Sequence, residues 1–231
     1  AMEDPVIRLN RLDACAVSDA MDKLGMAGAV SGLEQRAGTG RIAGRVVTYR
    51  LVAHGEAAPA GGAPVRHLGT TAIERARPGD VVVAEQRTGI DAACWGGILT
   101  LGAKLKGMAG VVAEGPVRDL DEALAYDFPV FSRGATARTA RGRLAEAATG
   151  EPVRVGEVRV CTGDYVIADR SGVVFVPTAE IERVLDAAEG LFAREAAMAK
   201  ALLGGAPITE VMGANYENML LPAQGTARRK E

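Results

Sequence analysis

The sequence predicts an α/β fold with a mixed sheet and with helices near both ends of the chain. Single strands alternate with helical segments through much of the chain, as layered α/β proteins require. Two further strands, Tyr165–Ala168 and Val173–Val176, flank a Ser171-Gly172 turn and predict a hairpin. Because strands occur both between helices and as a hairpin, we expect parallel and antiparallel pairing in one fold.

The composition is typical of one domain with short terminal extensions. The chain has 231 residues, of which 48% are hydrophobic, enough for a substantial core. Its 27 basic and 29 acidic residues give a net charge of −2, so no general attraction to nucleic acid is expected. No apolar run approaches the length of a membrane span. We therefore expect a single domain over residues 1–231, with a core at about 9–219 and a flexible tail at 220–231.

Cysteine usage indicates a reducing compartment. Cys15, Cys94 and Cys161 are odd in number and lie far apart, which does not suit a disulfide framework. The first residues lack the basic start and the apolar middle of a secretory signal. Together these observations predict a cytoplasmic protein. With two histidines and no CxxC motif, no structural zinc site is predicted.

The first third of the chain predicts two helices and two strands. Apolar residues recur at helical spacing over Leu9–Leu24, and a glycine ends the pattern. Gly44–Leu51 alternates in the manner of a strand, and Val81–Ala84 follows an RPGD turn. Between these strands we expect a surface loop over His54–Pro64 and a helix over Val65–Arg75.

The central segment, Trp95–Glu122, predicts a helix, a strand and a turn into another helix. Its first helix is expected to bury a face of four apolar residues at steps of three or four, namely Ile98, Leu101, Leu105 and Met108. Val111-Val112 follows as a short buried strand. The turn GPVRD comes next, and it places two charged residues at a strand-to-helix junction, where α/β proteins bind ligands.

The last part of the chain predicts short strands before one long helix. The segment 134–150 is rich in Ala, Arg and Thr and predicts no regular element. The longest helix is expected over Ala179–Leu203, where two glycines end it. The remaining predicted elements are a helix at Leu120–Tyr126, strands at Pro129–Ser132 and Glu157–Val160, and a final helical turn at Ile208–Met212.

Arg118 and Asp119 are the strongest candidates for chemistry. The planar guanidinium of an arginine pairs with carboxylates, and an aspartate can hold a hard cation such as Mg²⁺. A helix that begins at Gly96-Gly97 would expose the amides of Ile98 and Leu99 to an anionic oxygen. The alternative interpretation is structural, because an Asp three residues before a Glu is also a capping-box pattern.

Glu114, at the end of the same strand, either faces this site or is a solvated turn residue. Cys94 has no histidine near it in the sequence, which favours a small buried residue over a nucleophile. Glu189 and Glu195 lie on the long helix, where surface ion pairs are the default interpretation.

Several of these segments together resemble the RraA-like family. That family includes class II 4-hydroxy-4-methyl-2-oxoglutarate aldolases, often with oxaloacetate decarboxylase activity, and regulators of ribonuclease E. The similarity runs from about Leu9 to Met219 and rests on VSDAMDKLG, GRVVTYRL, RPGDVVV, the central segment followed by FPVFSRG, and GDYVIADRSGVVFVP. It implies a β/β/α swivelling-domain sandwich that assembles as a homotrimer or homohexamer, with the site at a subunit boundary.

The resemblance also implies a function and a site. The function would be that of a divalent-metal-dependent lyase, which cleaves 4-hydroxy-2-oxo acids, decarboxylates oxaloacetate, or does both, and releases pyruvate. Arg118 would bind the small 2-oxo acid, and Asp119 would bind Mg²⁺ or Mn²⁺. The pyruvyl-binding segment would comprise Gly96, Gly97, Ile98 and Leu99.

The chain departs from the family pattern at Gly97, where aldolase members usually carry an acidic residue. Glu114, or a glutamate at position 189 or 195 of a neighbouring subunit, could replace that carboxylate, so the expected catalytic set is Arg118, Asp119 and Glu114. Two alternatives follow from the glycine. One is a relative with an altered substrate, and the other is a non-catalytic protein that binds and regulates a ribonuclease.

Overall fold

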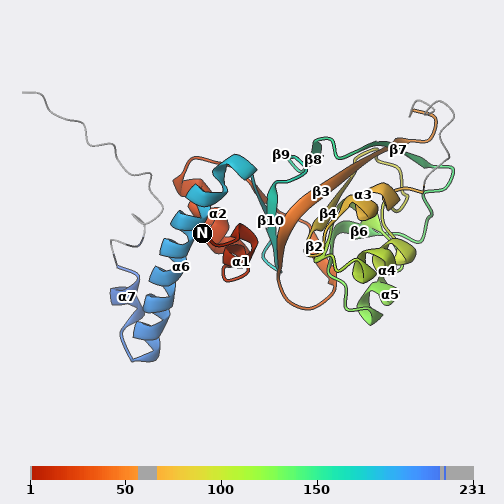
Figure 1. The fold of residues 1–231 in the computed structure, drawn as a ribbon. Helices are drawn as coiled ribbons and strands as arrows, with labels where there is room; N and C mark the ends of the chain where they lie inside the picture. The colour runs from red at the N-terminus through yellow and green to blue at the C-terminus, as the bar shows by residue number, and fades with distance from the viewer. Residues whose placement is uncertain (1, 57–66, 214–215, 217–231) are drawn as a thin grey trace, which may run out of the picture.

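One long strand, β3 (Ile42–Ala53), joins the two halves of a curled mixed sheet, as Figure 1 shows. The computed structural model describes residues 2–56, 67–213 and 216. Within them the sheet has the strand order β1-β11-β10-β3-β4-β5-β6-β2, and β7 pairs separately with β3. The remaining strands are β1 (Ala29–Val30), β2 (Glu34–Ala37), β4 (Val81–Gln86), β5 (Gly110–Val117), β6 (Val130–Ala135), β7 (Leu144–Thr149), β8 (Val153–Val155), β9 (Val158–Val160), β10 (Tyr165–Ala168) and β11 (Val173–Val176).

The two ends of β3 belong to different kinds of sheet. Its first residues pair antiparallel with β10, and Ile42 lies opposite Ala168. From Val46 onward it pairs in parallel with β4, which continues in parallel through β5 to β6. Parallel strands need helical crossovers, and these bring the carboxyl ends of β4, β5 and β6 to one edge.

Helices cover the outer face of each half. α3 (Thr70–Arg75), α4 (Gly97–Leu105) and α5 (Leu120–Ala125) pack on the parallel half, whereas α1 (Pro5–Leu9), α2 (Ala14–Lys23) and α6 (Ile181–Leu203) pack on the antiparallel half. A short 3₁₀ helix (Thr178–Glu180) precedes α6, and α7 (Ile208–Val211) follows it. A third, valine-rich core fills the inside of the curled sheet. The result is a helix–sheet–sheet–helix arrangement, which agrees with the predicted swivelling-domain-like sandwich.

The long helix α6 is held to the N-terminal helix by one arginine. Arg8 contacts Glu182 and Asp186 at 2.7 Å and Glu189 at 2.8 Å. Glu189 is therefore an ion-pair residue within its own chain, but its partner is an arginine of another helix rather than a neighbour at helical spacing. None of the described helices is long and apolar enough to cross a membrane.

Most predicted elements are present, and the hairpin is confirmed by the pairing of Tyr165 with Val176. The segment Leu9–Leu24 contains the predicted helix, α2, which begins only at Ala14 because Asp13 caps it by accepting a hydrogen bond from the Ala16 amide. The helix predicted over Val65–Arg75 begins only at Thr70. Residues 57–64 of the predicted loop, residues 65–66 and the predicted tail at 220–231 lie outside the described residues.

The buried face predicted for α4 is wrong at two positions. Ile98 is 82% exposed and Leu105 is 80% exposed, although Met108 beyond the helix is buried. The helix instead packs through Leu99, Thr100 and Ala103. Both sides of α4 carry apolar residues at helical spacing, so periodicity alone could not decide which side meets the sheet.

Candidate functional site

The start of α4 and the end of β5 lie side by side, although they are twenty positions apart in the sequence. The Cys94 amide donates to the Pro116 carbonyl at 2.9 Å, and the Arg118 amide donates to the Trp95 carbonyl at 3.0 Å. The Gly97 amide donates to Asp119 Oδ2 at 2.8 Å. These three contacts confirm that the predicted helix start and strand end meet at one edge of the sheet.

Asp119 directs its side chain toward α4 rather than toward its own helix. It precedes α5 with a left-handed backbone, φ 57°, and makes no side-chain capping bond to α5. The capping-box interpretation is therefore wrong for this residue. Asp119 Oδ2 accepts a hydrogen bond from the Gly97 amide and also lies 3.4 Å from Arg118 Nε. A left-handed aspartate costs about 1 kcal/mol or more, and such strain is common at functional sites.

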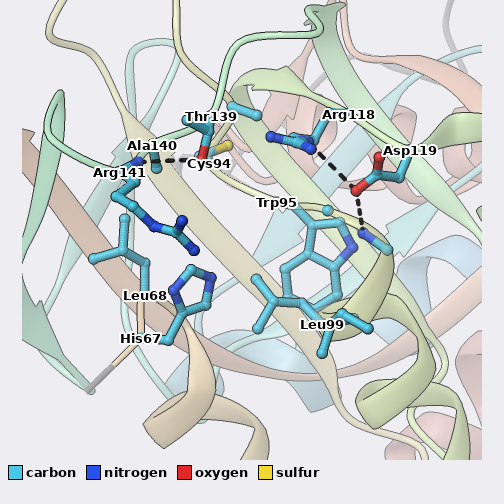
Figure 2. A pocket seen from close by; sticks show the side chains of 14 residues that line it. His67, Leu68, Cys94, Trp95, Leu99, Arg118, Asp119, Thr139, Ala140 and Arg141 are labelled. Atoms are coloured by element: carbon cyan, nitrogen blue, oxygen red, sulfur yellow. Dashed lines mark hydrogen bonds and ion pairs between the residues drawn. The ribbon is translucent and has the colours of Figure 1, made fainter.

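These residues line a pocket of about 230 Å³, shown in Figure 2. Arg118 and Asp119 are on one side of it, with side chains 36% and 33% exposed. His67 and Arg141 lie on the opposite side, where the sequence predicted no site residue. The rest of the lining comes mainly from residues 93–99 and 139–140. The pocket thus combines one carboxylate with arginine side chains from two separate segments.

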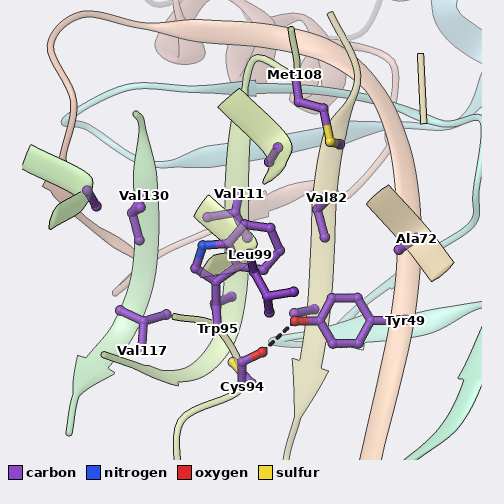
Figure 3. Close-up of a cluster of buried hydrophobic side chains, with 14 of the residues drawn as sticks. Tyr49, Ala72, Val82, Cys94, Trp95, Leu99, Met108, Val111, Val117 and Val130 are labelled. Carbon is purple, nitrogen blue, oxygen red and sulfur yellow. Dashed lines mark hydrogen bonds between the residues drawn. The ribbon is translucent and has the colours of Figure 1, made fainter. Parts of the chain in front are cut away.

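The floor of the pocket is rigid. Trp95 is 2% exposed, stacks on Phe128 with ring centroids 6.4 Å apart, and donates from Nε1 to Thr100 Oγ1 at 2.8 Å. Figure 3 shows Tyr49, which donates its hydroxyl to the Cys94 carbonyl. Trp95 thus packs beside the pocket, directly before the Gly96-Gly97 turn.

The first turn of α4 offers free backbone donors. Gly96 is the N-cap residue and has no side chain to cap the helix. The Gly97 amide donates a hydrogen bond to Asp119, and the Thr100 amide donates one to the Gly96 carbonyl. Within the described part of the chain, no hydrogen bond involves the amides of Ile98 and Leu99. Donors at a helix start attract anionic oxygens.

Glu114 lies apart from this pocket. On β5, Ala113 and Val117 face the helix-covered core, whereas Val112 faces the inner core, so strand alternation directs Glu114 to the inner side. There its carboxylate accepts hydrogen bonds from Arg133 at 3.0 and 3.1 Å and from the Gly156 amide at 2.9 Å. Its predicted catalytic role is not supported by this geometry.

Glu122 lies beside the site, and the sequence indicated it only as a capping residue. It stands in the first turn of α5 and lines a second hollow together with Arg118 and Asp119. Its Oε2 lies only 1.9 Å from the point where a Cβ on Gly97 would stand. The Asp-to-Glu spacing of three residues was the available signal, since it puts both side chains on one face of a helix start.

Cys94 is a buried structural residue. It is 2% exposed, and its Sγ lies 3.3 Å from the Pro116 carbonyl. Burial raises the pKa of its thiol from 9.0 to about 12, so it stays protonated at neutral pH. The expectation of a small buried residue is confirmed.

The donor set at Asp119 fits a hard cation that keeps other ligands. Among the described residues, no group of three or more His, Cys, Asp or Glu side chains could enclose a metal ion. Mg²⁺ is commonly held by one or two carboxylates, with water and substrate completing its shell. The hydrogen bond and ion pair of Asp119 within the described chain both use Oδ2, which leaves Oδ1 for such an ion.

Comparison with known proteins finds relatives by sequence, some of which are named as aldolases. A protein of Halalkalibacterium halodurans named "Putative 4-hydroxy-4-methyl-2-oxoglutarate aldolase" is 31% identical over 57% of this chain and 62% of its own length. Protein DlpA of Legionella pneumophila is 23% identical over 88% of this chain but 32% of its own length. The matched part of this chain thus spans less than two thirds of either relative.

The fold also occurs in solved structures, some of which have a regulator's name. RraAS2 of Streptomyces coelicolor, described as an unusual member of the RNase ES inhibitor RraA protein family, is 25% identical. It superposes with a TM-score of 0.71 over 84% of this chain and 95% of its own. The family model for RraA-like proteins, described as Aldolase/RraA, matches residues 14–175. That match covers most of the fold and all residues that line the pocket. The chain therefore belongs to the RraA-like family.

Proposed function

We propose that this protein is a divalent-metal-dependent carbon–carbon lyase that acts on 2-oxo acids and releases pyruvate. The observation that carries the proposal is the joining of Arg118, Asp119 and the start of α4 at the mouth of one pocket. A guanidinium, a carboxylate and free backbone amides within one small cavity suit a substrate with a carboxylate beside a carbonyl.

The residues have separate roles in this proposal. The amides of Ile98 and Leu99 receive the substrate carboxylate, and Arg118 faces the 2-oxo oxygen, where negative charge develops as the carbon–carbon bond breaks. Asp119 would hold the Mg²⁺ or Mn²⁺ ion, which as a Lewis acid would stabilise the same charge. His67 and Arg141 stand across the pocket, where a second anionic group of the substrate would lie.

Two substrates distinguish the proton-removal step of the reaction from the enolate-forming step. A 4-hydroxy-2-oxo acid requires removal of a hydroxyl proton as well as stabilisation of an enolate, whereas oxaloacetate decarboxylation requires only the enolate half. The name of the Halalkalibacterium relative supports the first substrate class. We therefore propose both reactions for this chain, with decarboxylation less sensitive to loss of a base.

Pyruvate release measured with purified full-length protein tests the proposal. With Mg²⁺ and either oxaloacetate or a 4-hydroxy-2-oxo acid, we expect release that EDTA abolishes and added Mg²⁺ restores. Each rate is taken relative to the spontaneous, metal-catalysed decay of the substrate without protein. The proposal is wrong if the protein adds nothing to that background, or if Arg118→Ala and Asp119→Ala both leave its activity intact.

We also propose that the chain assembles as a homotrimer or homohexamer with this site near a subunit boundary. The exposed apolar side chains of Ile98 and Leu105 support this, because they project from the helix whose first turn forms the pocket. Large apolar side chains that are mostly exposed on one helix face are typical of a surface covered in an assembly.

A second candidate function is regulation of a ribonuclease by binding. The likeness to Streptomyces coelicolor RraAS2 over 84% of this chain favours it. Mixing the protein with a purified ribonuclease of the RNase E type and following RNA cleavage tests it. Inhibition that persists in Arg118→Ala, from a protein with no lyase activity, would favour regulation over catalysis.

A further inference from the structure

The space that a side chain at position 97 would need is occupied by Glu122. We propose that Glu122 is the proton-transfer group of this site, and that the glycine at position 97 leaves room for its carboxylate. The inference rests on the proposed lyase function and names the residue that takes the proton from the substrate hydroxyl.

Steric fit accounts for the glycine better than backbone freedom does. A Cβ on Gly97 would lie 1.9 Å from Glu122 Oε2, 2.9 Å from Glu122 Cδ and 3.2 Å from Asp119 Cβ. Real Cβ atoms essentially never approach another heavy atom within 3.0 Å. Gly97 begins a regular helix and does not have a left-handed φ, so any residue could adopt its backbone. A side chain at position 97 would therefore displace the flexible end of the Glu122 side chain from the position it has beside this glycine.

The position of Glu122 suits proton transfer in the pocket. Gly97, Arg118 and Asp119 line the pocket, while Arg118 and Asp119 also line the adjoining hollow with Glu122. Glu122 itself lines only the adjoining hollow, and its carboxylate lies against Gly97, which lines the pocket. Within the described residues it has no side-chain hydrogen bond or ion pair, whereas Glu114 is held by Arg133 and the Gly156 amide. A carboxylate without partners is free to accept a proton directly or through one water molecule.

The chemistry separates the two reactions. In cleavage of a 4-hydroxy-2-oxo acid, Glu122 takes the hydroxyl proton, and the oxygen electrons form the new carbonyl at C4 as the C3–C4 bond breaks. The bond electrons become the C2–C3 enolate, whose oxygen faces Arg118. Protonation at C3 then gives pyruvate and returns the proton count to its start. Oxaloacetate loses carbon dioxide from a carboxylate that is already ionised, so it does not need Glu122.

The test replaces Glu122 by its closest neutral analogue. Glu122→Gln keeps the shape but cannot accept the proton, and we expect kcat for hydroxy-acid cleavage to fall by roughly 10²- to 10⁴-fold, with KM little changed. Oxaloacetate decarboxylation should stay within about threefold of wild type. Glu157→Gln is the control, because it makes the same exchange at an exposed glutamate that lines neither hollow, and both activities should be unchanged.

A relocation experiment keeps the inference testable if Glu122→Gln folds poorly. Gly97→Asp alone should have reduced hydroxy-acid cleavage, because its side chain displaces the Glu122 carboxylate and repels its charge. The double variant Gly97→Asp with Glu122→Ala removes the clash and puts a carboxylate in the same space, so its cleavage should exceed that of either single variant. Thermal unfolding of each variant shows whether it is folded.

The outcomes distinguish this inference from the proposed function. If wild type cleaves hydroxy acids and Glu122→Gln cleaves them equally well, or loses both activities in parallel, Glu122 is not the base and the lyase assignment stands. If wild type shows no metal-dependent pyruvate release, the proposed function fails and the inference fails with it. A selective loss of hydroxy-acid cleavage supports both.

Discussion

Asp119 accepts a hydrogen bond from the backbone amide of Gly97, 22 residues earlier in the chain, at 2.8 Å. It therefore caps α4, whose own N-cap residue is a glycine, while it stands at the start of α5. This one contact ties the two helix starts together and aligns the carboxylate with Arg118. The same residue thus has a structural role and a position suited to binding a cation.

Removing Arg118 should slow pyruvate release without unfolding the protein. Its side chain is 36% exposed, so Arg118→Ala leaves no buried cavity. By analogy with the loss of one oxyanion donor, we expect the barrier to rise by on the order of 3 kcal/mol, or about a hundredfold in kcat/KM. Steady-state kinetics measure this, with Arg138→Ala as control, because Arg138 pairs with Asp91 on the surface. Equal losses in both variants would contradict a specific role.

Two substitutions at Asp119 should separate its structural role from its charge. Asp119→Asn still accepts the Gly97 amide and tolerates the left-handed backbone, so its free energy of unfolding should stay close to wild type while metal-dependent activity falls. Asp119→Ala loses the cap and disfavours φ 57°, which should cost about 2 kcal/mol in addition. Urea unfolding and a Mg²⁺ titration of activity measure the two effects. An active Asn variant would argue against a cation at Asp119.

Cys94 should make the protein less stable at alkaline pH. Burial raises the pKa of its thiol to about 12 in the folded protein from 9.0, so its contribution to stability is complete below pH 9 and declines as the pH rises toward 12. In urea unfolding at several pH values above 8, Cys94→Ala should show a shallower decline of the unfolding free energy than wild type. Burial also raises the pKa of Tyr49, so part of the decline remains in the variant.

The exposed side of α4 should decide the oligomeric state. Leu105 is 80% exposed in the single chain, and a charge at this position would oppose burial against another subunit. We expect Leu105→Asp to shift the mass measured by light scattering from a trimer or hexamer toward a monomer, with an unchanged circular dichroism spectrum. Lys104→Asp is the control, because it changes charge on the same helix at an exposed polar position. A monomeric wild type would refute the proposed assembly.

Some features of the fold and site could be predicted because they depend on neighbours in the sequence. The hairpin from Tyr165 to Val176 follows from alternation and a Ser-Gly turn, and α6 from a long helical period. The placement of Arg118 and Asp119 between β5 and α5 follows from the local pattern of apolar run, glycine, proline and charge. β7 was missed because its Ala-rich residues lack alternation and pair only with the far end of β3.

The sequence by itself determined the family, the helices and strands with a strong local pattern, and the junction that carries Arg118 and Asp119. Only the tertiary structure decided that Glu114 faces the inner core, that His67 and Arg141 stand across the pocket, and that Glu122 fills the space beside Gly97. The physical reason is that local spacing sets which element forms, whereas packing between elements distant in the chain sets which side chains meet.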